Sequence, residues 1–178
     1  MQLTSLPLKD SFLIELKPHG DDRGFFARLF CKEVFAELGL DPHITQINNS
    51  FSAPKGTLRG LHYQLAPYAE TKIVRCIQGS FYDVIVDLRP DSPTYKQSYG
   101  AVLSAANRRM MYVPKGFAHG FLTLEENSEV IYFVTQAYNK EHERGIRWDD
   151  PFFNIEWPES PQIISERDRQ HPDFTESY

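Results

Sequence analysis

Short apolar runs separated by turn-forming residues recur along most of this chain, and this pattern restricts the fold more than any other feature. The runs are rich in β-branched and aromatic residues, which favour strands. Clusters of Gly, Pro, Asn, Asp and Ser separate them. The predicted strands cover residues 12–16, 25–30, 57–65, 71–77, 81–88, 100–103, 110–113 and 129–138. Many short strands at roughly 8–12-residue spacing predict a sandwich or a barrel.

Two of the runs, residues 82–86 and 131–134, are apolar or aromatic almost throughout. Strands of this kind are covered on both faces, which favours a closed barrel or a sheet buried in a dimer. Residues 32–38 (KEVFAEL), followed by Gly39, predict a short helix with a glycine stop. The proline-containing tail from Pro151 onward still carries large apolar residues, so we expect it to pack on the barrel. The prediction is one all-β domain, residues 1–178, with a few short helices.

Composition excludes several classes of protein. The net charge of −5 argues against a general nucleic-acid binder, which needs a surplus of Lys and Arg. Cys31 and Cys76 form no CxxC pair, so neither a disulfide framework nor a Cys-rich zinc site is expected. Lys9 and Asp10 precede any long apolar run, and no stretch approaches the roughly 18 apolar residues of a membrane helix. We therefore expect a cytoplasmic protein that binds no membrane.

The densest polar group within a strand-like run is the segment 58–64 (LRGLHYQ). Strand alternation places Arg59 on one face with Leu61, and His62 on the other face with Gln64. A lone histidine on a barrel strand is more often a structural residue than a catalytic one, so His62 needs further support.

A second segment, residues 114–120 (PKGFAHG), matches the second metal-binding motif of cupin barrels. The first cupin motif requires H-x-H followed by a nearby glutamate. Here the segment reads His62-Tyr63-Gln64, with Glu70 further away. Replacing an imidazole by an amide removes a strong ligand from a site that needs three or four. The prediction is a cupin barrel without a metal site.

The sequence resembles a known family over most of its length, from about residue 21 to 168. The segments that carry the resemblance are 22–26, 56–64, 72–76, 82–89, 92–94, 116–121, 145–148, 150–151 and 165–168. They resemble the dTDP-4-dehydrorhamnose 3,5-epimerases of deoxysugar and polysaccharide biosynthesis. The resemblance implies a cupin-type β-barrel (jelly roll), a homodimer, and cofactor-free epimerisation at C3, C5 or both of a nucleotide-linked 4-keto-6-deoxy sugar.

The resemblance also implies roles for single residues. A C4 ketone acidifies the hydrogens on C3 and C5, so epimerisation needs a base on one face of the sugar and an acid on the other. The family's base matches His62, supported by Asp168, and its acid matches Tyr132. Lys72 matches the group that stabilises the enolate oxygen. The implied substrate-binding residues are Arg23, Arg59, Lys72, His119, Tyr138, Glu143, Arg167, Gln46 and Asn48.

Three departures from the family pattern affect specificity. Arg28 stands where the family has an acidic residue, and Phe133 stands where a lysine is common. The segment 46–52, which resembles the part that contacts the base, is one residue out of register with Arg59. These changes leave open which sugar and nucleotide are used and which carbon is inverted.

Three other functions remain open at this level. The same barrel is used by nucleotide-sugar 3,4-ketoisomerases, but the matches at Tyr132 and Asp168 belong to the epimerase pattern. A cupin that binds sugar nucleotides without turning them over would keep the same pocket. A metal-dependent cupin oxygenase is least favoured, because the H-x-H pair is missing.

Overall fold

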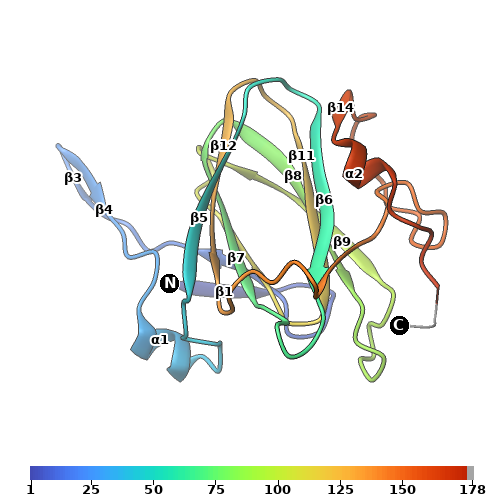
Figure 1. Cartoon of the computed structure of the whole chain (residues 1–178). Coiled ribbons are helices and arrows are strands. Elements are labelled where there is room, and N and C mark those ends of the chain that lie inside the picture. Colours follow the sequence, from blue (N-terminus) through green and yellow to red (C-terminus); the bar gives the residue numbers. More distant parts are fainter. Residues whose placement is uncertain (176–178) are drawn as a thin grey trace.

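Two facing β-sheets make up most of the molecule in the computed structural model, which describes residues 1–175 (Figure 1). The first sheet has the order β1 (Gln2–Ser5), β2 (Phe12–Glu15), β10 (Met110–Val113), β7 (Lys72–Gln78), β12 (Ser128–Val134) and β5 (Gln46–Ser52). The second has the order β13 (Glu143–Gly145), β6 (Thr57–Gln64), β11 (Phe117–Thr123), β8 (Ser80–Asp87) and β9 (Ser98–Ser104). A short β14 (Ile163–Ile164) pairs with β6 in parallel. The predicted all-β class is confirmed, and the two layers are those of a jelly roll.

The main core lies between the sheets, because alternate residues of each strand point inward. Phe81 and Ile85 of β8 face Val74 and Cys76 of β7 in this core. The opposite side of β8 is also covered: Val84 and Val86 pack under the C-terminal segment. The prediction that residues 82–86 are buried on both faces is therefore confirmed. In β12 the result differs, because Ile131 and Phe133 on the outer side are only partly buried.

The predicted helix is confirmed as α1 (Lys32–Glu37), and the Gly39 that follows it has the left-handed φ of 73°. α1 buries Phe35 against Ile14 and Met110 on the outer face of the first sheet. The predicted strand 25–30 is wrong beyond Phe26. Residues 19–26 form a hairpin of β3 (His19–Asp21) and β4 (Gly24–Phe26) that extends away from the two sheets (Figure 1). The predicted strand 129–138 is also too long, because β12 ends at Val134.

The tail from Pro151 packs on the outer face of the second sheet, as predicted for its described part; residues 176–178 lie outside the described residues. It contributes Phe153 and Trp157 to the cluster around Val84. It then forms α2 (Glu166–Arg169), which lies beside β6 (Figure 1). The Ser165 side chain caps α2 by accepting the N–H of Asp168 at 3.1 Å. Neither helix in the described part of the chain has the length and hydrophobicity needed to cross a bilayer.

Candidate active site

A cleft lined by strands of both sheets contains most of the polar side chains singled out from the sequence. It consists of two adjoining cavities of about 700 and 410 Å³. Six residues line both cavities: His62, Lys72, Tyr132, Tyr138, Glu143 and Arg167. β6 of the second sheet supplies His62, while β7 and β12 of the first sheet supply Lys72 and Tyr132. Tyr132 and His62 therefore enter the cleft from opposite sheets.

A β-bulge in β6 brings Arg59 and His62 to the same side, contrary to the prediction from alternation. His62 pairs with His119 and Arg59 pairs with Phe121, so three steps along β6 match two steps along β11. The extra residue reverses the alternation between Arg59 and His62, and both line the larger cavity. Gly60 sits in the bulge with φ of 107°, and a Cβ there would lie 2.7 Å from the Gly120 Cα. Only glycine fits this position.

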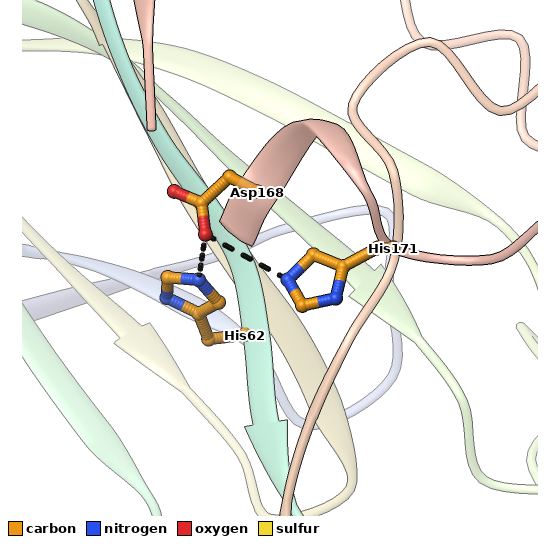
Figure 2. Close-up of side chains that lie close together, drawn as sticks. All are labelled: His62, Asp168 and His171. Atoms are coloured by element: carbon orange, nitrogen blue, oxygen red, sulfur yellow. Dashed lines mark hydrogen bonds and ion pairs between the residues drawn. The ribbon is translucent and has the colours of Figure 1, made fainter. Parts of the chain in front are cut away.

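His62 and Asp168, separated by more than a hundred residues in sequence, form a short hydrogen bond (Figure 2). Nε2 of His62 lies 2.7 Å from Oδ1 of Asp168, and the carboxylate is almost fully buried. Burial alone would raise the pKa of Asp168, but the hydrogen bond and charge of His62, with the Gly60 N–H, outweigh it and lower the pKa to about 2. An ionised Asp168 accepts the Nε2 proton. The other ring nitrogen, Nδ1, has no hydrogen-bond partner among residues 1–175 and is left as the basic atom.

A second histidine, His171, approaches the same carboxylate oxygen as His62 (Figure 2). Its Nε2 is 3.7 Å from Asp168 Oδ1, and its ring stands edge-on to that of His62. The ring packs directly on Gly145, where any Cβ would come within 2.1 Å of Nε2. Burial lowers the pKa of His171, and repulsion by His62 lowers it further. Sequence reasoning missed this residue, although its position three residues after Asp168 was a usable signal.

His119 of β11, which lines the larger cavity, forms another His–Asp pair with Asp83 of β8, which does not line it. Nε2 of His119 lies 2.7 Å from Oδ1 of Asp83. Asp83 is fully buried, and its Oδ2 has no hydrogen-bond partner among the described residues. Burial raises the pKa of Asp83, and His119 and Lys72 only partly offset that effect. Asp83 lies within the apolar run 82–86, and nothing in that run indicates its partner.

Lys72 and Tyr132 lie on the first sheet, facing His62 across the cleft. The Lys72 ammonium lies 3.1 Å from Glu70 Oε1 and donates to the carbonyl oxygen of His62 at 3.1 Å. The Tyr132 side chain is partly buried against the main core, and burial raises its pKa, with Arg59 partly offsetting the rise. The phenol is therefore protonated at neutral pH and able to donate.

The rim of the cleft is built around Glu143 of β13. Its Oε2 accepts the Tyr138 hydroxyl at 2.9 Å and Nη1 of Arg167 at 3.0 Å. Nη2 of Arg167 lies 3.0 Å from His62 Nε2; because Nε2 donates its proton to Asp168, this is a close approach of two donors and not a hydrogen bond. Gln46 and Asn48 of β5 line the smaller cavity, and Gln46 accepts the backbone N–H of Tyr138.

Arg23 is the one predicted site residue that this chain does not bring to its own cleft. It lies in the turn of the β3–β4 hairpin, almost fully exposed, and pairs with Asp21 at 2.6 Å. Arg28 is also exposed and lines neither cavity of the cleft. Phe133 packs partly against the cluster on the outer face of the first sheet, away from the cleft.

The side chains near the cleft suit proton transfer better than metal binding. His62, Asp168 and His171 form the one group of three His, Cys, Asp or Glu ligand atoms within 4.8 Å among the described residues. The short His62–Asp168 hydrogen bond places a proton where an ion would have to bind. Gln64, at the position of a cupin metal ligand, directs its amide nitrogen to Glu70 at 2.7 Å and to backbone carbonyls.

Comparison with known proteins gives one consistent result. The family model for dTDP-4-dehydrorhamnose 3,5-epimerase matches residues 5–176. The dTDP-4-dehydrorhamnose 3,5-epimerase of Pseudomonas aeruginosa is 45% identical over 179 residues, covering 99% of this chain and 98% of that protein.

Two solved structures share the fold over nearly the whole chain. The dTDP-4-dehydrorhamnose 3,5-epimerase of Elizabethkingia anophelis superposes with a TM-score of 0.94 at 43% identity, covering 98% of this chain and 96% of that one. The Legionella pneumophila dTDP-6-deoxy-D-glucose-3,5-epimerase, solved in complex with dTDP-4-keto-L-rhamnose, gives a TM-score of 0.87 at 39% identity, covering 94% and 89%.

Proposed function

Because this chain belongs to the dTDP-4-dehydrorhamnose 3,5-epimerase family, we propose that it epimerises C3, C5 or both of a nucleotide-linked 4-keto-6-deoxy sugar. One observation carries the proposal most: a carboxylate-supported histidine and a protonated tyrosine enter one cleft from opposite sheets. Inverting a carbon next to a ketone needs a base and an acid on opposite faces of the sugar ring.

In the proposed reaction, Nδ1 of His62 removes the proton from C5 or C3. The electron pair of the broken C–H bond moves into the ring, and negative charge develops on O4 of the ketone. The Lys72 ammonium stabilises that charge. The Tyr132 hydroxyl then delivers a proton to the same carbon from the opposite face, which inverts the centre. One proton leaves and one arrives, so the reaction is redox-neutral and needs no cofactor.

Asp168 supports the base in two ways. By accepting the Nε2 proton, it fixes the tautomer in which the lone pair lies on Nδ1. Its negative charge stabilises the imidazolium that forms when His62 takes the sugar proton. His119 donates no proton to carbon in this scheme and binds the substrate instead.

The remaining polar side chains suit the nucleotide diphosphate. Arg59 and Arg167 supply cations at two sides of the larger cavity, and guanidinium groups bind phosphate oxygens in pairs. Gln46 and Asn48 offer amides in the smaller cavity, which we assign to the base of the nucleotide. Tyr138, exposed at the rim, adds an aromatic surface beside them.

We further propose that the active form is a cytoplasmic homodimer in which Arg23 reaches the partner's cleft. The hairpin that carries Arg23 exposes Phe25 by 48% and Phe26 by 65%. Two guanidinium nitrogens of Arg75, on the first sheet, are buried without a hydrogen-bond partner among the described residues. A second subunit would cover the aromatic side chains and offer acceptors to Arg75. The cysteines Cys31 and Cys76 are free thiols, which suits a reducing compartment.

The test is hydrogen exchange into the substrate. The protein is incubated with dTDP-4-keto-6-deoxyglucose in deuterated water, and the C3 and C5 protons are followed by NMR. We expect loss of one or both signals, with no loss in a His62→Asn variant. His43→Asn is the matched control, because His43 pairs with Asp41 at 3.1 Å on the surface, away from the cleft. No exchange by the unmodified protein, with UDP-linked and GDP-linked keto sugars also unchanged, would contradict the proposed function.

A further inference from the structure

A chain of buried polar contacts runs from Lys72 along the wall of the smaller cavity, and the proposed reaction does not use it. Glu70 Oε1 lies 3.1 Å from the Lys72 ammonium, and Glu70 Oε2 accepts Nε2 of Gln64 at 2.7 Å. The Glu70 and Lys72 side chains are only 8% and 12% exposed, so solvent screens their attraction weakly. We propose that Glu70 is a positioning residue that holds the Lys72 ammonium toward the substrate ketone, and that Gln64 holds Glu70. This inference rests on the proposed epimerase function.

The hydrogen-bonding capacity of Lys72 supports this assignment. An ammonium group has three N–H donors. One lies toward Glu70 and a second donates to the carbonyl oxygen of His62. These two contacts fix the direction of the third N–H, and Lys72 lines both cavities of the cleft. The carbonyl contact also places the ammonium at a set distance from the strand that carries the base.

The surroundings of Glu70 require a carboxylate rather than an amide. Both of its neighbours, the Lys72 ammonium and the Gln64 Nε2 group, are donors. The orientation of the Gln64 amide is fixed, because its Oε1 accepts the backbone N–H of Asn139 at 2.6 Å. Its nitrogen must therefore face Glu70. A glutamine at position 70 offers one acceptor and one donor, so it can accept from only one of these two neighbours.

Gln64 also connects this chain of contacts to the rim of the cleft. Its amide nitrogen donates to the carbonyl oxygen of Ala137, and its oxygen accepts from Asn139. These two residues flank Tyr138, which lies at the rim. The position that would hold a metal ligand in a metal-binding cupin thus ties Lys72 to the segment that carries Tyr138.

Glu70→Gln tests the proposal by deuterium exchange into dTDP-4-keto-6-deoxyglucose. We expect kcat to fall by roughly tenfold to a hundredfold with KM changed less than about twofold, because the misplaced ammonium acts mainly on the developing enolate. Glu159→Gln is the matched control, since Glu159 pairs with Lys55 at 3.0 Å and lines neither cavity of the cleft. The control variant should keep the full rate.

A double-mutant cycle with Lys72→Met separates positioning from a general structural role. If Glu70 acts through Lys72, Glu70→Gln has no further effect on the exchange rate of the Lys72→Met protein. Gln64→Met, which keeps Glu70, should give a smaller loss that also disappears in the Lys72→Met background. Equal losses with and without Lys72, or an unchanged kcat in Glu70→Gln, would overturn the proposal. Absence of exchange by the unmodified protein would instead contradict the proposed function itself.

Discussion

The two His–Asp pairs of the cleft have the same contact distance but opposite electrostatic settings. His62–Asp168 and His119–Asp83 each join a ring Nε2 to a carboxylate oxygen at 2.7 Å. Asp168 also accepts the Gly60 N–H, and its pKa is lowered to about 2. Asp83 is fully buried with one oxygen unpartnered among the described residues, and burial raises its pKa. The contact distance in a His–Asp pair therefore does not determine the pKa of its carboxyl group. The groups around the carboxylate determine it.

In the proposed reaction this difference gives the two histidines different roles. An ionised Asp168 stabilises positive charge on His62, which a base acquires when it takes a proton. His62 is also the more accessible of the two, with a side chain 25% exposed against 11% for His119. His119, held by a deeply buried carboxyl group, is suited to a fixed hydrogen bond with the substrate.

The largest expected effect separates the two histidines directly. His62→Asn should lower the rate of deuterium exchange by about 10³-fold, within the range of general base catalysis. His119→Asn should lower kcat/KM by only about tenfold to a hundredfold, mainly through KM, because it removes a binding contact. NMR exchange rates over a range of substrate concentrations measure both. Equal losses of kcat in the two variants would contradict the assignment of His62 as the base and His119 as a binding residue.

Gly60→Ala should disturb both pairs at once, since the bulge lies between them. The new methyl group would lie 2.7 Å from the Gly120 Cα, at a φ of 107° that other residues avoid. We expect a loss of about 3 kcal/mol in the free energy of unfolding, from strain and from this backbone contact. Gly39→Ala is the control: Gly39 has φ of 73° but nothing within 4 Å of its Cβ position, so about 1 kcal/mol is expected. Urea unfolding measures both losses. Equal losses would show that the contact of the new methyl group with the Gly120 Cα does not lower stability.

Tyr132→Phe should uncouple exchange from inversion. Removing the hydroxyl leaves His62–Asp168 intact, so His62 still removes and returns protons on its own face. Formation of the inverted sugar should fall by about 10²-fold, while deuterium uptake falls much less. Chromatography of the products, set against NMR exchange, tests this. Parallel losses of uptake and inversion would place Tyr132 on the base side of the reaction.

The two carboxyl groups should also contribute to stability with opposite pH dependence. The pKa of Asp168 is lower in the folded state, so its contribution is present above the unfolded value of about 3.8 and is lost as pH falls toward 2. At neutral pH this contribution is about 2 kcal/mol, which Asp168→Asn should remove. The pKa of Asp83 is raised, so its ionisation opposes folding as pH rises above the unfolded value. Asp83→Asn should therefore leave stability at pH 7 unchanged or higher. Urea unfolding at pH 3 and pH 7 compares them, and equal losses in both variants would contradict the assignment.

Local sequence patterns predicted most of the fold. Alternating apolar residues indicate which side of a strand faces the core, and turn residues indicate where strands end. The prediction failed for residues 27–30, where Phe30 leaves the hairpin and packs on Phe35 at 4.8 Å between ring centroids. It also did not name residues 46–52 as a strand, although Ile47 and Phe51 alternate with polar residues there. Those polar residues face the cleft, so this strand lacks the apolar inner face by which buried strands are predicted.

The site was harder to predict than the fold, because its contacts join distant parts of the chain. Resemblance named His62 and Asp168, but only the fold shows α2 holding the carboxylate against β6. The bulge that turns Arg59 to the side of His62 was missed, although Gly60 within a strand was a usable signal. The partnership of Asp83 with His119 depends on the pairing of β8 with β11, which no local pattern contains.

The most direct test compares deuterium uptake at C3 and C5 by the unmodified protein, Asp168→Asn and Asp83→Asn under one set of conditions. We expect Asp168→Asn to lose uptake by about 10³-fold, because the wrong tautomer of His62 is then stabilised. We expect Asp83→Asn at saturating substrate to stay within about tenfold of the unmodified rate. The reverse order, or an equal loss in both variants, would contradict the assignment of His62–Asp168 as the base.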